Sequence, residues 1–242
     1  MSDTTPSPEQ KRSSVRVPKW ESDTVDRVRT GLRRIVKPLQ ELCARDANEG
    51  DTRLIVTDIL SDLLGYDKYS ELATEYMVRG EFADYGIRID GDLVAMVEVK
   101  RVATTLGKKH LRQVEMYGVN EGVEWLLLTN ARTWQAYRLV PGMPVRVDMV
   151  LDVDLLGGSG TLAAKASGLA YLSREFMKRN RLSDLWRVST ATSPTQLAAV
   201  LLGDRVLDEA RKDLKRLTGH AIETAELARL LRETVIRDGL AN

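Results

Sequence analysis

The sequence predicts an α/β fold in which a mixed β-sheet is flanked by helices and followed by a C-terminal helical extension. Two observations predict it. Helix-like and strand-like segments follow one another between residues 23 and 155 in the order helices, strands, helix, strands. After Gly157-Gly158-Ser159-Gly160 the strand pattern ends and only helical periodicity remains. We therefore expect a flexible N-terminal arm (1–20), an α/β domain (21–156) and the helical extension (157–242).

Composition places the chain among ordinary folded proteins. Of its 242 residues, 43% are hydrophobic and 29% are charged, which is enough apolar side chain for a large core. No apolar run approaches the ~18 residues of a membrane-spanning helix, and the first residues lack the apolar stretch of a signal peptide. We expect a cytoplasmic protein with no membrane partner. At a net charge of +1, a nucleic-acid partner would require local basic patches.

Two helices are expected before the first strand. Apolar residues recur at helical spacing from 23 to 47, where Pro38 is a candidate kink. A second helix is predicted over 52–64, with Asp51 as its N-cap and Gly65 as its stop.

Six strands and one intervening helix form the predicted sheet region. The strands are expected at 73–78, 84–89, 93–100, 125–130, 134–140 and 146–155, and the helix runs from Lys108 to Gly118 or Gly122. In the extension we predict helices over 161–179, 194–217 and 223–237, with a cap at Ser193-Pro194 and a stop at Gly219. This extension could pack on the sheet, form a dimer or bind DNA; we favour packing or dimerisation.

The stretch LVAMVEVKR, residues 93–101, carries the chemistry. Because side chains alternate along a strand, Glu98 and Lys100 share one face with Val94 and Met96, and Leu93 lies on the other face. Both faces begin apolar, which indicates a central strand, and the two charges emerge at its carboxyl end, where sites on α/β sheets form. An E-x-K triplet alone is commonly an ion pair within a strand.

The surroundings of this triplet indicate a metal site. Asp84 lies one strand earlier, across the turn at Asp90-Gly91-Asp92, so it and Glu98 can present two carboxylates side by side. With one cysteine and two histidines in the chain, a bound metal would take oxygen ligands, which favours Mg²⁺, Mn²⁺ or Ca²⁺.

Together these residues resemble the PD-(D/E)xK nuclease superfamily, and more narrowly the N-terminal nuclease domain of type I restriction R subunits and their stand-alone relatives. The resemblance covers residues 50–140. Glu75 matches the Glu that this family carries on its first core strand, with Glu81 as its rival. Gln113 and Tyr117, at i and i+4 of one helix, match a Q-x-x-x-Y pattern found in several branches. Asp84 follows Ala83 where the family has proline.

The resemblance implies a restriction-endonuclease-like fold and Mg²⁺-dependent hydrolysis of DNA, with Mn²⁺ as a substitute, in restriction or phage defence. Asp84, Glu98 and the Val99 carbonyl would hold the metal, and Lys100 would orient the attacking water. Glu75 would add a water-mediated or second-metal ligand. Gln113 and Tyr117 would position Lys100 or the nucleic-acid backbone. Phosphates would be held by a basic set: Arg101, Lys108, Lys109 and Arg112.

Partners follow from the same reasoning. The chain has no G-x-x-x-x-G-K-[ST] phosphate loop, so a motor or specificity subunit would be a separate chain. Cutting both DNA strands with one site per chain favours a homodimer.

The hairpin geometry tests the metal site. A two-residue loop at Asp90-Gly91 in a regular hairpin would pair Asp84 with Val97, and Glu98 would then lie on the opposite face. A shared face requires an odd-numbered loop or a β-bulge, which we therefore predict.

Two alternatives remain open at this point. The fold could serve as a nucleic-acid-binding or regulatory module with little catalysis. The triplet could also be coincidental in an unrelated α/β scaffold, where Glu98 would pair with a basic neighbour such as Arg88.

Overall fold

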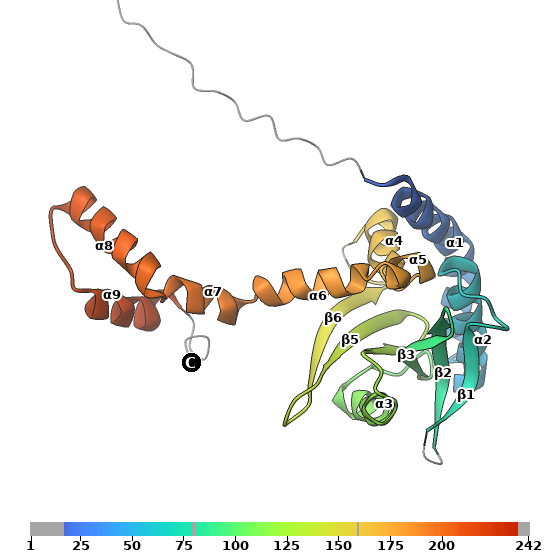
Figure 1. The fold of residues 1–242 in the computed structure, drawn as a ribbon. Coiled ribbons are helices and arrows are strands. Elements are labelled where there is room, and N and C mark those ends of the chain that lie inside the picture. Colours follow the sequence, from blue (N-terminus) through green and yellow to red (C-terminus); the bar gives the residue numbers. More distant parts are fainter. Residues whose placement is uncertain (1–16, 79–80, 159, 237–242) are drawn as a thin grey trace, which may run out of the picture.

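The computed structural model describes residues 17–78, 81–158 and 160–236. It confirms an α/β fold with a six-stranded mixed sheet, flanking helices and a helical C-terminal region (Figure 1). Most of the expected N-terminal arm lies outside the described residues. Lys19 and Trp20, which we assigned to that arm, instead begin the first helix.

The strands stand in chain order across the sheet: β1 (Leu72–Val78), β2 (Glu81–Ile89), β3 (Asp92–Val99), β4 (Trp125–Thr129), β5 (Thr133–Val140) and β6 (Arg146–Asp154). Neighbouring strands are antiparallel except β3 and β4, which are parallel. A parallel pair requires a crossover, which α3 (Lys108–Glu121) supplies. The strand that carries Glu98 is therefore central, as the sequence predicts.

Helices cover the two faces of the sheet unequally. On one face lie α1 (Lys19–Ala44) and α2 (Glu49–Asp58), with the π-helical turn η1 (Ile59–Leu63) that continues α2 (Figure 1). They share a large core with the sheet that includes Leu32, Ile59 and Val97. On the other face α3 closes a smaller core around Met96 and Tyr117.

The α1 helix contains Pro38, as expected, and starts earlier than the predicted residue 23. The start of α2 also differs from expectation. In α2 the N-cap is Asn48 and not Asp51, because the Asn48 side chain accepts the Asp51 N–H at 2.8 Å. The helix consequently begins three residues earlier than predicted. Gly65, with φ of 81°, lies just past the helical turn as expected.

The C-terminal region contains more helices than the sequence predicts. They are α4 (Leu162–Ala170), α5 (Arg174–Lys178), α6 (Arg181–Ala191), α7 (Pro194–Leu201), α8 (Asp204–Thr218) and α9 (Thr224–Leu230), which continues as the π-helical turn η2 (Leu231–Val235). The predicted cap at Ser193-Pro194 and stop at Gly219 are confirmed. Thus 161–179 and 194–217 each hold two helices instead of one, and α6 was not predicted.

The helices after Gly157 do not all form a unit apart from the sheet. Ala166, Leu169, Phe176 and Leu182 belong to the same core as the strands. The Gly/Ser run therefore marks a change from strand to helix, and the core continues across it. None of the helices in the described parts of the chain combines the length and apolar character that crossing a membrane requires.

Candidate metal-dependent active site

The β2–β3 hairpin contains the predicted bulge. Next to the two-residue turn, Ile89 pairs with Asp92 and Arg88 with Leu93. Ile87, however, pairs with Ala95, so Val94 is an extra residue in β3. Beyond it Gly86 pairs with Met96 and Tyr85 with Val97, so the register after the bulge is shifted by one residue, as predicted.

Because of the bulge, two side chains of β3 lie on the opposite faces of the sheet from those that we expected. Leu93 packs against the core that contains Met96, and Val94 packs against the core that contains Val97. We expected the reverse, because regular alternation ignores the extra residue. From Ala95 onward the alternation is as predicted.

Asp84 is fixed to the end of the central strand by hydrogen bonding. Its Oδ2 accepts the backbone N–H of Val99 at 2.7 Å, and its Oδ1 lies 3.2 Å from Nη1 of Arg53, a residue of α2. The carboxylate thus satisfies a strand N–H, and only 12% of its side chain is exposed. Burial raises the pKa of Asp84, while the Val99 N–H and Arg53 oppose that shift.

A chain of hydrogen bonds connects β3 to α3. The Lys100 ammonium group pairs with Glu98 Oε1 and donates to Gln113 Oε1 at 3.1 Å. Gln113 Nε2 in turn donates to Tyr117 Oη at 3.1 Å. Because an ammonium group only donates, Gln113 must turn its oxygen to Lys100 and its amide nitrogen to Tyr117. Sequence reasoning named these four residues, and the structure brings them into direct contact.

Glu98 is the most buried charged group of the site. Its side chain is 3% exposed, and its Oε2 is buried without a hydrogen-bond partner. Burial raises the pKa of Glu98 to about 7, against the opposing effect of Lys100. The negative charges of Asp84 and Glu49 add to the rise. A buried carboxylate oxygen with no donor is costly in a folded protein, which suggests that a cation or proton completes the site.

Two further carboxylates lie near this pair. Glu75 is exposed, has φ of 49°, and lines a cavity of about 320 Å³ together with Arg53 and Asp84. Glu49, at the start of α2, is close enough for its charge to raise the pKa of both Asp84 and Glu98. Sequence reasoning missed Glu49 because it placed the start of α2 after this residue; Asn48 as a cap was the available signal.

The residues present fit a metal held by few protein ligands. Within residues 17–78, 81–158 and 160–236, no group of three or more His, Cys, Asp or Glu side chains is arranged to hold a metal ion. Asp84 and Glu98 remain as a pair of oxygen donors, and Glu98 Oε2 is buried without a hydrogen-bond partner. Mg²⁺ suits such a site because it retains several waters and takes one or two carboxylates.

The predicted phosphate-binding residues lie on one stretch around the start of α3. Lys108, Lys109 and Arg112 are exposed there, and the helix has no acidic residue in its first turn and no capping side chain at Gly107. A helix N-terminus already favours anions, so cations at this end are unfavourable unless an anion is bound. Arg101 differs, because it forms an ion pair with Asp46.

The alternative partner for Glu98 is not used. Arg88 donates to the Gly91 carbonyl at 2.9 Å and lies 3.4 Å from Tyr76 Oη. Glu98 therefore pairs with Lys100, inside the E-x-K triplet itself.

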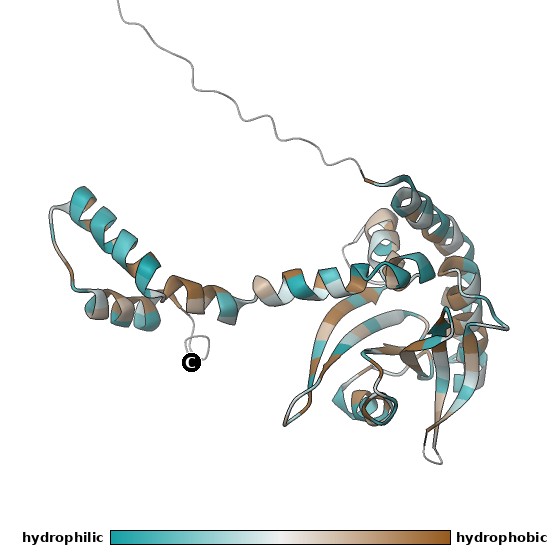
Figure 2. Ribbon diagram, in the orientation of Figure 1, coloured by the Kyte–Doolittle hydropathy of each residue, from teal (hydrophilic) through white to brown (hydrophobic). Residues whose placement is uncertain are grey.

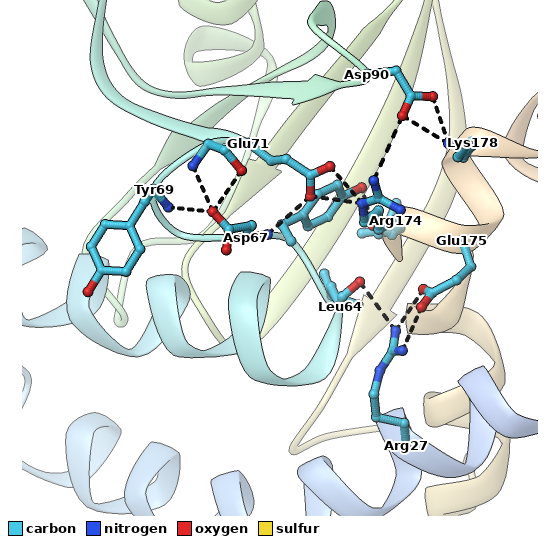
Figure 3. Close-up of polar contacts among 12 residues, drawn as sticks. Arg27, Leu64, Asp67, Tyr69, Glu71, Asp90, Arg174, Glu175 and Lys178 are labelled. Atoms are coloured by element: carbon cyan, nitrogen blue, oxygen red, sulfur yellow. Dashed lines mark hydrogen bonds and ion pairs between the residues drawn. The ribbon is translucent and has the colours of Figure 1, made fainter.

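A cluster of ion pairs fastens the β2–β3 turn to the helices (Figure 3). Asp90 of the turn pairs with Lys178 at 2.8 Å, and Arg174 Nη2 lies 3.9 Å from Asp90. Arg174 also donates from Nε to both oxygens of Glu71, at 2.6 and 2.9 Å. Nearby, Arg27 pairs with Glu175 at 2.6 Å. The turn that determines the register of the site is thus anchored to α5.

Comparison with protein-family models, with curated proteins and with solved structures finds no match for this chain in any of the three. Its function is therefore inferred from the sequence pattern and from the geometry of the site.

Proposed function

We propose that the chain is a Mg²⁺-dependent DNA endonuclease with a restriction-endonuclease-like domain, acting in restriction or phage defence. The observation that carries the proposal is the buried Glu98–Lys100 pair at the end of the central strand. Asp84 is anchored beside it, and Gln113 holds Lys100 from α3. These residues resemble the PD-(D/E)xK pattern in their order along the chain, and their proximity in the structure supports the proposal.

In this proposal Asp84, Glu98 and the Val99 carbonyl hold Mg²⁺ or Mn²⁺. The bound metal would polarise the scissile phosphate and stabilise the leaving oxygen. Asp84 is suited to the role because its Val99 hydrogen bond fixes the carboxylate to the strand that carries Glu98. Glu49 or Glu75 would add a ligand through water.

Lys100 would position the attacking water. Its ammonium group has three donors, of which two point to Glu98 and Gln113, so the third is available for a water or a phosphate oxygen. Gln113, oriented by Tyr117, limits the directions in which the ammonium group can turn. Both helix residues would therefore act through Lys100.

Exposed cations would hold the substrate. Lys108, Lys109 and Arg112 begin α3, the helix whose Gln113 contacts Lys100, so phosphates bound there would lie on the same side of the sheet as the site. Such contacts carry no sequence preference. A specificity or motor subunit would be a separate chain.

The test is cleavage of plasmid DNA by the purified protein in Mg²⁺. We expect wild-type protein to cleave, and Glu98→Ala and Lys100→Ala to lose cleavage. Mg²⁺ chelation should abolish the wild-type reaction. Equal cleavage by all three proteins would indicate a contaminating nuclease and refute this site.

A second function is favoured by the ion pairs of the site. Both carboxylates face a cation of the chain, Asp84 with Arg53 and Glu98 with Lys100. This pairing also suits a module that binds nucleic acid without cutting it. Binding of DNA by wild-type protein without cleavage in Mg²⁺ or Mn²⁺, with loss of binding in a Lys108→Glu, Lys109→Glu variant, would favour this function over the nuclease.

A further inference from the structure

The last helices form an arm that leaves the sheet. We call residues 188–236 the C-terminal arm; it comprises the end of α6 together with α7, α8, α9 and η2. Figure 1 shows α6 leading away from the sheet and α7 to α9 lying beyond it. The last anchors on the sheet side come from α6 itself, where Leu182 is buried and Trp186 donates to Asp148 at 3.1 Å.

Within the described residues, this arm makes its side-chain hydrogen bonds and ion pairs only with itself. The ion pairs join residues three or four positions apart on one helix, such as Lys212 with Glu209. Its own core contains only Leu207, Leu227 and Ala228 as buried members. A core of this size does not by itself offset the entropy of ordering about fifty residues.

The arm also exposes much apolar surface. Among the described residues, nine of the eighteen exposed large apolar side chains lie in it: Val188, Leu197, Val200, Leu201, Val206, Leu214, Leu217, Leu230 and Val235. Figure 2 shows α7 as largely hydrophobic and α8 as largely hydrophilic with apolar positions. Exposed apolar surface gathered in one region indicates an interaction surface.

Five of these residues form two stripes at helical spacing. On α7, Leu197, Val200 and Leu201 are 47–53% exposed and share one face. On α8, Leu214 and Leu217 continue the row of Leu207, and Leu217 is 79% exposed. Leu207 is covered by α9, so the open part of the α8 row is its C-terminal half.

The charges beside the two stripes have opposite signs. The first half of α8, next to α7, carries Asp204, Asp208 and Glu209 against a single Arg205. The second half carries Arg211, Lys212, Lys215 and Arg216 against a single Asp213. The apolar stripe of α7 thus lies beside the acidic first half of α8. The Leu214–Leu217 stripe lies within the basic second half of α8.

We propose that the C-terminal arm is a dimerisation surface whose occupant is the arm of a second copy of this chain, in antiparallel orientation. The α7 stripe of one copy packs on Leu214 and Leu217 of the other, and the two-fold axis repeats the contact. The acidic half of each α8 then faces the basic half of its partner. A parallel arrangement would place like charges together and is disfavoured. This inference does not depend on the proposed nuclease activity.

The first test compares solution masses of the full-length protein by size-exclusion chromatography with light scattering. Wild-type protein is expected at twice the 27.1 kDa chain mass. Leu217→Lys should be monomeric, and because this side chain is 79% exposed its helix content should match wild type. Met143→Lys, which alters a fully exposed apolar residue of the β5–β6 turn, is the matched control and should remain dimeric. A monomeric wild type at ~100 μM, or a dimeric Leu217→Lys, overturns the proposal.

The second test uses charge reversal and asks whether the partner is a second copy of the arm. One variant carries Lys215→Glu and Arg216→Glu; the other carries Asp208→Lys and Glu209→Lys. Each alone should be monomeric, since its two α8 halves then have the same sign. An equimolar mixture should form a heterodimer, because one chain is acidic and the other basic along α8. If the mixture stays monomeric while circular dichroism shows wild-type helix content, the arm does not pair with its own copy in this way.

Discussion

The Val99 backbone N–H donates to Asp84 Oδ2 at 2.7 Å, so a carboxylate satisfies the end of the central strand where a neighbouring strand carbonyl would ordinarily do so. The same carboxylate faces Arg53 through its other oxygen. One side chain thus serves both the fold and the candidate metal site, and these two roles can be separated by substitution.

Asp84→Asn retains an oxygen that can accept the Val99 N–H but removes the charge. We expect its free energy of unfolding to lie within ~1 kcal/mol of the wild-type value. The rate of DNA cleavage should fall by roughly 100-fold or more. Asp84→Ala also removes the acceptor and should cost a further ~1–3 kcal/mol. Urea denaturation and plasmid cleavage measure the two effects. Equal stability of the Asn and Ala variants would show that the hydrogen bond to Val99 contributes little.

The bulge in this hairpin could be predicted from the expectation that Asp84 and Glu98 share one face of the sheet. Two carboxylates that share a metal must share a face, and with a short turn at Asp90-Gly91 that requires a bulge; the structure places it at Val94. The same reasoning could not locate the extra residue, so it assigned Leu93 and Val94 to the wrong faces. The position of a bulge depends on how the side chains pack against the cores on both faces of the sheet. The sequence of one strand does not contain this information.

Other features depended on contacts that sequence patterns do not reveal. The start of α2 was placed too late because Asn48, not Asp51, caps it, and Glu49 was missed for that reason. The α7–α8 break was missed because Gly203, between them, adopts an extended conformation that helical periodicity does not predict. Local hydrophobic spacing predicted β3, β4 and β5 well, since these strands are buried over most of their length. The edge strands β1 and β6 are mostly exposed or half-buried, and turn residues beside them helped to place them.

Gln113 is expected to act as a positioning residue for Lys100. Gln113→Ala removes the acceptor at 3.1 Å, which should lower kcat about tenfold with little change in KM, because the ammonium group is misdirected and not lost. Tyr117→Phe should have a smaller effect in the same direction. Cleavage kinetics on a short DNA duplex measure both.

A double variant separates a shared role from two independent ones. If Tyr117 acts mainly through Gln113, the double variant Gln113→Ala, Tyr117→Phe should be no slower than Gln113→Ala. If the fold losses in kcat of the two single variants multiply in the double variant, the two residues act separately.

The ion-pair cluster of Figure 3 should contribute unequally to stability. The Glu71 side chain is 11% exposed and accepts from Arg174 and from the Asp67 N–H, so Glu71→Ala should cost roughly 2 kcal/mol. Asp90, 57% exposed, pairs with Lys178 in a solvated position, and Asp90→Asn should be clearly milder. Urea denaturation decides between them, and a larger loss in Asp90→Asn would contradict this ranking.

The burial of Glu98 predicts how stability and metal binding depend on pH. Because burial raises the pKa of Glu98 from 4.5 to about 7, the folded state favours the neutral acid. The resulting stability is present below pH ~4.5 and is lost as pH rises through ~7, by up to ~3 kcal/mol. Mg²⁺ requires the carboxylate, so its binding should release a proton and strengthen as pH rises over the same interval.

This effect is measured by the melting temperatures of the wild-type protein and of the Glu98→Gln variant from pH 5 to 8, each with and without Mg²⁺. The Gln side chain is neutral at every pH, so the variant should be more stable than metal-free wild type at pH 8 and similar to it at pH 5. Mg²⁺ should stabilise wild type at pH 8 and leave the variant unchanged. Asp84, whose pKa is also raised by burial, is present in both proteins. Wild-type and variant curves that run parallel from pH 5 to 8 would show that Glu98 does not titrate in this range.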